Sequence, residues 1–74
     1  MKSVRVRLEY PLERVSEPVV TRLVKDFDVS PNVLAADIEA TKGGWMVLGL
    51  TGEPGQVDKA LAWIKTIGVG LTVE

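Results

Sequence analysis

The sequence of 74 residues contains no cysteine and no histidine. Without thiols the chain cannot form disulfides, thiolate metal sites or iron–sulfur centres, and without imidazole it lacks the commonest ligand of catalytic zinc. General acid–base catalysis near neutral pH also relies most often on histidine. We therefore expect no metal site, no cofactor and no enzymatic activity.

Charge of one sign is equally scarce, because nine basic and ten acidic residues give a formal net charge of -1. Nucleic-acid binding depends on neutralising phosphates, so this balance disfavours a nucleic-acid partner. The sequence shows no basic, apolar leader and no apolar run near the ~20 residues that a bilayer-spanning helix needs. These absences predict a cytoplasmic protein, or an excised soluble piece of a larger one, without direct membrane insertion.

What is present is a high hydrophobic content, 46% of the residues, which is ample for a globular core. A chain of this size nevertheless buries only roughly 60% of its unfolded surface, so its core is thin. Small domains without disulfides or metals often compensate by self-association. We therefore expect residues 1–74 to form a single domain that associates as a homodimer.

Alternation of apolar and polar residues predicts four half-buried strands. We expect them at residues 4–10, 33–41, 45–51 and 69–73. The Gly43-Gly44 pair between the second and third strands predicts a tight hairpin turn, because a two-residue turn needs positive φ angles.

Two further segments repeat apolar residues with the period of a helix. The apolar face of the first segment consists of Val20, Leu23, Val24 and Phe27. That of the second segment consists of Val57, Ala60, Leu61 and Ile64. Ser16 is the expected N-cap of the first helix, and Gly68 stands where a left-handed residue ends the second.

This order of elements predicts an α+β domain with a ferredoxin-like βαββαβ sandwich. A right-handed crossover joins the first two strands in sequence, and the hairpin places the third strand between them. The resulting antiparallel sheet has the order 4-1-3-2, with both helices on one face.

The sheet face opposite the helices is expected to carry more apolar side chains than a solvent-facing sheet usually does. We expect this open face to contain Arg5, Arg7, Val33, Ala35, Asp37, Trp45, Val47 and Gly49, with Leu34 and Ala36 on the helix side. Its apolar members indicate an interaction surface made of Trp45, Val47, Val33 and Ala35. The alternative is a few scattered apolar residues of no special significance.

One pair of carboxylates, Asp37 and Glu39, shares a face of the second strand. Paired carboxylates can divide acid and base roles when their environments push their pKa values apart. On an alternating edge strand, however, such charges more often serve to discourage edge-to-edge pairing. We favour that reading, which leaves the chain without catalytic residues.

The stretch LVKDFDVSPNVLAADIEATKGG from Leu23 to Gly44 resembles the NIL domain family, which is named for an Asn-Ile-Leu signature. Residues 32–34, Asn-Val-Leu, stand at the signature position, with valine in place of isoleucine. The similarity continues through the Gly52 turn, the segment ALAWI of residues 60–64 and the Gly68-Val69 pair. It thus covers nearly the whole chain.

The resemblance implies a ferredoxin-like fold related to ACT regulatory domains. NIL domains occur at the C-terminus of the ATPase subunits of methionine ABC transporters, and others are fused to ferredoxins. In the transporters they are thought to bind methionine at an interface between domains. This chain carries no ATPase motifs, so the resemblance leaves open a free-standing domain or a fragment.

By this resemblance the function is that of a small regulatory domain, non-catalytic, that senses an amino acid such as methionine. The implied ligand site is Asn32 with the main chain of Val33, Leu34, Ala35 and Ala36. A side-chain amide supplies both a donor and an acceptor, which suits the two charged groups of an amino acid. Two alternatives remain: Asn32 merely begins a strand, or the domain docks on another protein without a small ligand.

Overall fold

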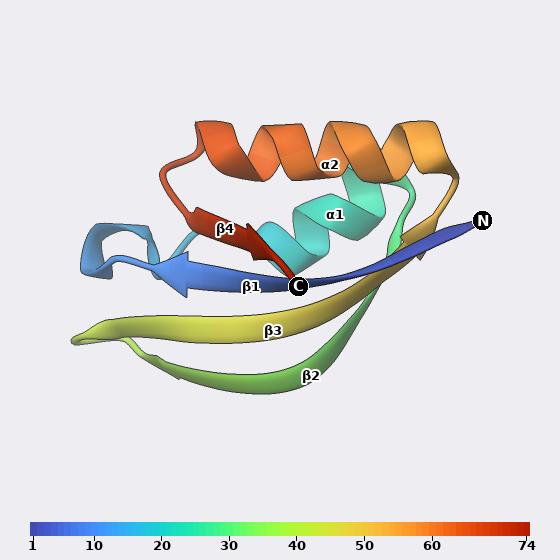
Figure 1. Cartoon of the computed structure of the whole chain (residues 1–74). Helices are drawn as coiled ribbons and strands as arrows, with labels where there is room; N and C mark the ends of the chain where they lie inside the picture. The colour runs from blue at the N-terminus through green and yellow to red at the C-terminus, as the bar shows by residue number, and fades with distance from the viewer.

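The computed structural model describes residues 1–74. It contains a four-stranded antiparallel sheet with both helices on one side (Figure 1). The elements are β1 (Lys2–Tyr10), the 3-10 turn η1 (Leu12–Arg14), α1 (Val19–Phe27), β2 (Ser30–Glu39), β3 (Gly43–Gly52), α2 (Pro54–Thr66) and β4 (Gly70–Val73). The sheet order is β2-β3-β1-β4. The predicted α+β class, the βαββαβ order and the 4-1-3-2 sheet are therefore confirmed.

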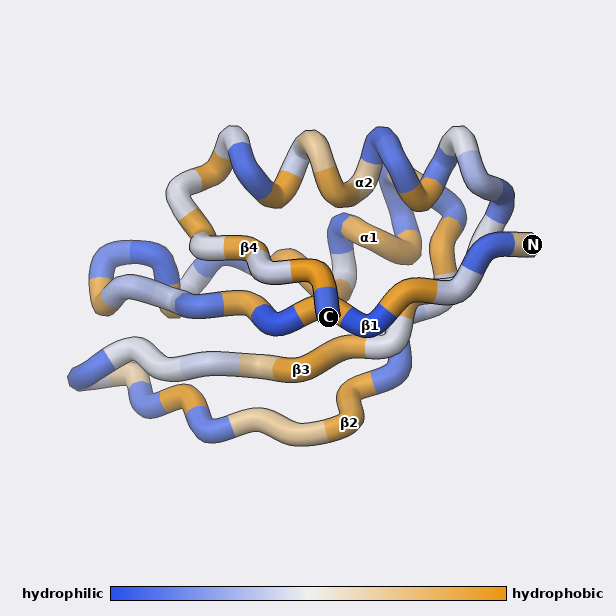
Figure 2. The backbone as a smooth tube through the Cα atoms, viewed as in Figure 1, coloured by the Kyte–Doolittle hydropathy of each residue, from blue (hydrophilic) through white to orange (hydrophobic).

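The core lies between the two central strands and the helices. Val6 and Leu8 of β1 and Leu48 and Leu50 of β3 are fully buried. Figure 2 shows the apolar side of α2 turned toward the sheet, where Val57, Ala60 and Ile64 are fully buried. Full burial of a large aliphatic side chain contributes about 1.5–3 kcal/mol, so these positions dominate the stability of the domain.

The start of α1 differs from the prediction. Pro18 occupies the N-cap position, no side chain caps the helix, and its carbonyl accepts the first bond, from the Arg22 amide at 3.0 Å. Ser16 lies two residues earlier, in the turn that follows η1. Pro18 fixes its own φ and lacks an N–H group, and the first amides of the helix are left without a side-chain cap. The N-cap role of Ser16 was therefore wrong, whereas Gly68 has the expected left-handed conformation, with φ of 81°.

The hairpin between β2 and β3 turns earlier than predicted. Its turn is formed by residues 40–42, and the Lys42 amide donates to the Glu39 carbonyl at 3.2 Å. Gly43 follows with a φ of 83°, and both glycines already belong to β3. A three-residue loop closed by a left-handed glycine is a common hairpin solution. The predicted two-residue Gly43-Gly44 turn was wrong, although the hairpin itself is confirmed.

The pairing of β2 with β3 contains an irregularity between Val33 and Ala35. Before it, Val33 pairs with Leu48, whose side chain is fully buried beneath the helices. After it, Ala35 pairs with Val47 on the open face, so Leu34 is an extra residue. Because a β-bulge adds one residue, the side chains before it point to the opposite side of the sheet from the one that uninterrupted alternation would give them.

Because of the bulge, two of the predicted side-chain orientations were wrong. Val33, expected on the open face, lies on the helix side, and Leu34, expected on the helix side, lies on the open face. There the Leu34 Cδ1 atom is 3.8 Å from the position that a Cβ on Gly49 would take. Strict alternation along residues 33–41 therefore fails at one residue, since a bulge leaves no mark in a period-two pattern.

Candidate functional site

Asn32 lies near the beginning of the edge strand β2, on the open face of the sheet. It pairs with Gly49 of β3, which in turn pairs with Arg5 of β1. Asn32 is exposed, and its side-chain amide makes no hydrogen bond within the chain. Both the donor and the acceptor of this amide are thus available to a ligand.

The four residues after Asn32 are exposed as well, although they belong to a regular strand. Val33 is 49% exposed and Leu34 is 45% exposed. The reason is position, because β2 has a neighbour on one side only and its outer main-chain groups face away from the sheet. The bulge at Leu34 interrupts the ladder further. The predicted ligand segment 32–36 is therefore contiguous and accessible.

No cavity of the single chain includes this segment. One cavity of about 170 Å³ lies at the far end of the sheet, between the start of α1 and the β2–β3 hairpin. A second cavity, of about 380 Å³, lies beside the C-terminal end of α1 and the N-terminal end of α2. It is lined by Met1, Val24, Asp28, Val29, Ser30, Thr51, Gly52 and Glu53. A ligand held by Asn32 would accordingly rest on an open surface unless a second chain covered it.

The predicted interaction surface is only partly brought together. Ala35 and Val47 pair directly on the open face, and Trp45 lies on the same side opposite Asp37. Val33 is on the other side of the sheet, for the reason given above. Three of the four predicted residues thus form one surface.

Trp45 is not a free aromatic face. The Arg7 guanidinium lies over its ring, 4.7 Å from the ring centroid. The Arg7 Nε atom also donates to a carboxylate oxygen of Glu9 at 2.5 Å. A cation placed over an aromatic ring is attracted to it, so Trp45 is half-buried under its own chain. One face of the Trp45 ring is consequently occupied by Arg7.

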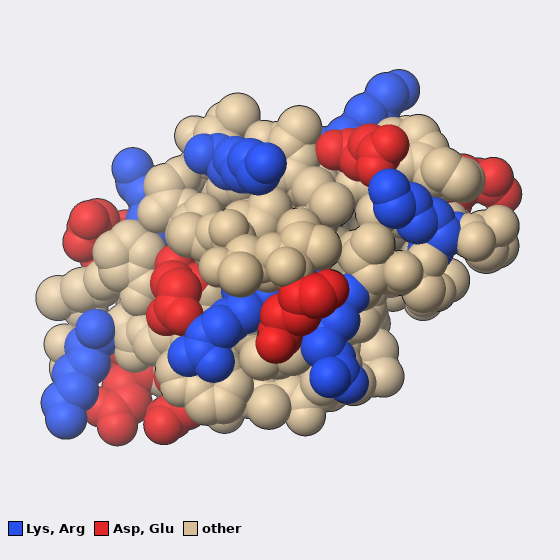
Figure 3. Space-filling view, in the orientation of Figure 1, with Lys and Arg blue, Asp and Glu red and all other residues tan.

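On the face of the molecule that Figure 3 shows, charges of both signs are interspersed, with no extended region of a single sign. On the edge strand, Glu39 lies 3.7 Å from the Lys42 ammonium, while Asp37 pairs with Trp45 across the sheet. Such exposed pairs contribute little free energy. This distribution gives the edge strand the mixed, solvated character that prevents uncontrolled strand pairing.

Tyr10 was not singled out from the sequence, and it is the one titratable residue with a clearly shifted pKa. Its residue is only 6% exposed, and burial raises the pKa of its hydroxyl above the ordinary 10.0. The sequence signal that could have indicated it is its position, because Tyr10 is an aromatic residue with a hydroxyl group at the end of the buried face of a strand. It lines the 170 Å³ cavity.

Comparison with known proteins gives consistent results. The family model described as NIL domain matches residues 4–73. A methionine import ATP-binding protein MetN of Streptococcus thermophilus is 37% identical over 71 residues, which is 92% of this chain and 20% of that protein. A MetN of Helicobacter hepaticus is 37% identical over 57 residues, or 73% of this chain and 16% of that protein. The chain thus spans about a fifth of the length of the curated relatives it matches.

Among solved structures, the C-terminal domain of an ABC transporter / ATP-binding protein from Enterococcus faecalis superposes with a TM-score of 0.84. The match covers 95% of this chain and 81% of that one at 20% sequence identity, which establishes the shared fold. Neither helix of the chain has the length and apolarity that crossing a membrane would require.

Proposed function

The chain belongs to the NIL domain family, and on that premise we propose that it is a non-catalytic regulatory module that senses an amino acid, methionine by preference. The matched relatives are named as methionine import ATP-binding proteins, and the chain corresponds to about a fifth of their length. Because those relatives are ATP-binding subunits, we place the protein in the cytoplasm. The observation that carries the proposal is the exposed, unpartnered Asn32 at the family's signature position.

The proposed ligand site is Asn32 together with the main chain of Val33 to Ala36. An amino acid presents an ammonium group that donates hydrogen bonds and a carboxylate that accepts them. The Asn32 amide offers one partner of each kind, and the outer edge of β2 offers further carbonyl and N–H groups because only β3 pairs with it. Leu34, which lies on the open face beside Gly49, supplies an apolar neighbour for a thioether side chain.

A second copy of the chain would complete the site. The segment 32–36 lies outside both cavities, and small ligands are ordinarily held where most of their surface is covered. Three of the exposed large apolar side chains, Val24, Val33 and Leu34, belong to β2 and to α1. A homodimer formed along this edge would bury them and enclose a ligand at Asn32.

Calorimetry tests the proposal with methionine and a panel of other amino acids at millimolar concentration. We expect saturable heat with methionine, weaker heat with polar amino acids, and binding weakened about tenfold or more for Asn32→Ala, since a hydrogen bond to a charged group contributes about 1.5–3 kcal/mol. The control is Ser3→Ala, which removes an exposed polar side chain from a different strand, β1. A folded dimer that produces no heat with any amino acid would overturn the proposal.

A second candidate function is a docking module that binds another protein and holds no small molecule. It is favoured by the open face, where Ala35 pairs with Val47 and Leu34 lies beside Gly49, with no helix over them. On this reading Val47→Asp should disrupt association while the domain stays folded, because Val47 points away from the core. Circular dichroism checks that the variant is folded, and an unchanged mass by light scattering, with no partner lost in pull-downs, would count against docking through this face.

A further inference from the structure

The cavity beside the start of α1 has the composition of a small-ligand site. Its volume is about 170 Å³, somewhat larger than the ~150 Å³ of an engineered apolar cavity that holds benzene. It opens to solvent between η1, the first turn of α1 and the hairpin end of the sheet. Its apolar wall is formed by Val15, Val19, Val20, Ile38 and Met46, with Pro18 beside them.

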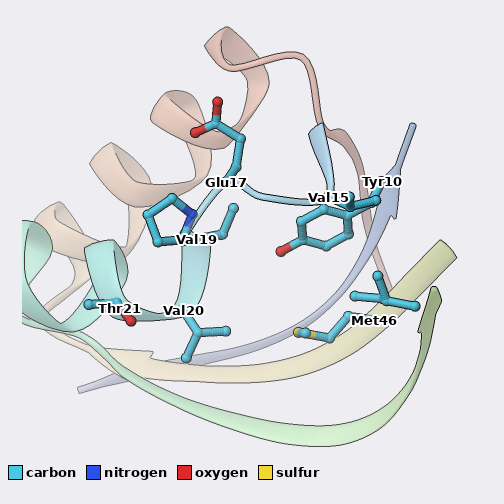
Figure 4. A pocket seen from close by; sticks show the side chains of 9 residues that line it. Tyr10, Val15, Glu17, Val19, Val20, Thr21 and Met46 are labelled. Carbon is cyan, nitrogen blue, oxygen red and sulfur yellow. The ribbon is translucent and has the colours of Figure 1, made fainter. Parts of the chain in front are cut away.

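One unpaired polar group, carried by a largely buried residue, faces this apolar wall. Figure 4 shows the hydroxyl of Tyr10 pointing into the space bordered by Val19, Val20 and Met46. Tyr10 is only 6% exposed, yet its hydroxyl makes no hydrogen bond with any other residue. The ring is buried, but the oxygen keeps some contact with solvent, because no unpartnered side-chain oxygen of a buried residue is itself fully buried. The hydroxyl thus borders the cavity and is free to donate to a bound molecule.

A second set of unpaired donors borders the same space. The main-chain N–H groups of Val20 and Thr21, in the first turn of α1, have no acceptor within the chain. The N-cap Pro18 contributes no side-chain cap, and the first turn holds no acidic residue. Unpaired amides at the start of a helix, together with its dipole, favour a negatively charged group.

We propose that this cavity binds a small branched aliphatic carboxylate. The aliphatic chain would contact Val20, Ile38 and Met46, and the carboxylate would accept hydrogen bonds from the Tyr10 hydroxyl and from the first turn of α1. An ordinary phenol with a pKa of about 10 is protonated at neutral pH, so the Tyr10 hydroxyl is able to donate. A molecule of six or seven non-hydrogen atoms matches the available volume.

Glu17 is the one acidic side chain at this cavity. In Figure 4 its carboxylate points away from the Tyr10 hydroxyl. Glu17 is half-buried, and repulsion between partly solvated like charges is weak, of the order of a few-fold in affinity. Its presence therefore lowers the affinity for a carboxylate without closing the site, and it gives the proposal a discriminating test.

This site is separate from the proposed amino-acid site. Ile38 and Asn32 stand six positions apart along β2, which corresponds to roughly 20 Å in an extended strand. Binding at one end can therefore be observed independently of binding at the other, and either proposal can fail without the other.

The experiment is a titration of the intact labelled chain with sodium isovalerate, followed by amide and methyl NMR at constant ionic strength. We expect saturable shifts at Val20, Thr21, Ile38 and Met46 with a millimolar dissociation constant, and no shift at Asn32. Tyr10→Phe should weaken binding about tenfold, since a hydrogen bond to a charged group is lost. Thr72→Val, which removes an exposed hydroxyl on β4, should leave it unchanged.

Two further arms test the charge of the ligand. Glu17→Gln should strengthen isovalerate binding a few-fold, and 3-methylbutylamine should bind more weakly than isovalerate. Shifts that stay linear in isovalerate concentration, a Tyr10→Phe variant that binds as tightly as the original chain, or preference for the amine would each overturn the proposal. The absence of methionine binding at Asn32 would overturn the amino-acid proposal and would not affect the carboxylate proposal.

Discussion

β2 and β3 are neighbours in the sheet and have 10 residues each, yet they differ in almost every other respect. β3 lies between two strands, and it buries Leu48 and Leu50 completely beneath the helices. β2 lies at the edge, and none of its residues is buried. The comparison teaches that one strand supplies stability, whereas its neighbour keeps side chains and main chain available for recognition.

The bulge at Leu34 fits this division. A strand with neighbours on both sides cannot take an extra residue without breaking two ladders, whereas an edge strand breaks only one. The extra residue in β2 brings Leu34 to the open face, next to the proposed ligand residue Asn32. The irregularity thus lies at the candidate site and not in the core.

The largest expected effect comes from truncating one leucine on each strand. Leu48→Ala should destabilise the domain by about 3 kcal/mol, because it leaves a cavity in a fully packed core. Leu34→Ala should cost less than about 1 kcal/mol, since that side chain is 45% exposed. Urea unfolding of both variants measures the difference, and equal losses would break the contrast between the two strands.

A second test concerns the hairpin that joins the two strands. Gly43→Ala should cost about 1–3 kcal/mol, because residue 43 has a φ of 83° and an added Cβ would overlap the Tyr10 carbonyl oxygen. Gly55→Ala in α2 is the matched control, since a Cβ there meets nothing within 4 Å, and it should be neutral or stabilising. If thermal unfolding shows both variants equally stable, the strained turn has no energetic importance.

A third test uses the pKa of Tyr10. Burial raises this pKa in the folded protein, so above pH 10 the unfolded chain loses its phenol proton while the folded chain retains it. Stability must therefore be fully present below pH 10 and fall as the pH rises above it. Urea midpoints between pH 8 and 11 should decline less for Tyr10→Phe than for the original chain. Parallel declines would show that the hydroxyl is not buried.

The smallest expected effect on stability is that of Asn32→Ala. The residue is exposed and makes no side-chain hydrogen bond within the chain, so its unfolding free energy should change by less than about 0.5 kcal/mol. Its effect on methionine binding should nevertheless be about tenfold or more. A variant that unfolds more easily while binding normally would assign Asn32 to structure and remove it from the proposed site.

Much of the fold could be predicted because local patterns agree with one another. The alternation in residues 4–10, the helical stripe ending at Ile64 and the glycine at position 68 all reappear as predicted. Asn32 was placed just before the second strand, expected at residues 33–41, whereas it is the third residue of β2 (Ser30–Glu39). What failed was local geometry that leaves no periodic signal: the bulge, the N-cap of α1 and the residues of the hairpin turn.

The candidate sites show the same limit. The resemblance pointed to Asn32, but nothing in the sequence indicates that the segment 32–36 lies outside every cavity. The interaction surface lost Val33 to the bulge, and Trp45 is partly covered by Arg7 through a cation–π contact. Contacts between side chains on different strands depend on register, and register depends on the bulge.

The sequence alone determined the class of the domain, its order of elements, its lack of thiol and imidazole chemistry and its family. These follow from composition and from periodicities of two and 3.6 residues, which reflect the geometry of single elements. The tertiary structure decided which strand remains exposed, which side Val33 and Leu34 occupy, and that Tyr10 faces a cavity beside α1. Those features arise because residues far apart in the chain are packed against one another, and no local pattern encodes the space that they leave.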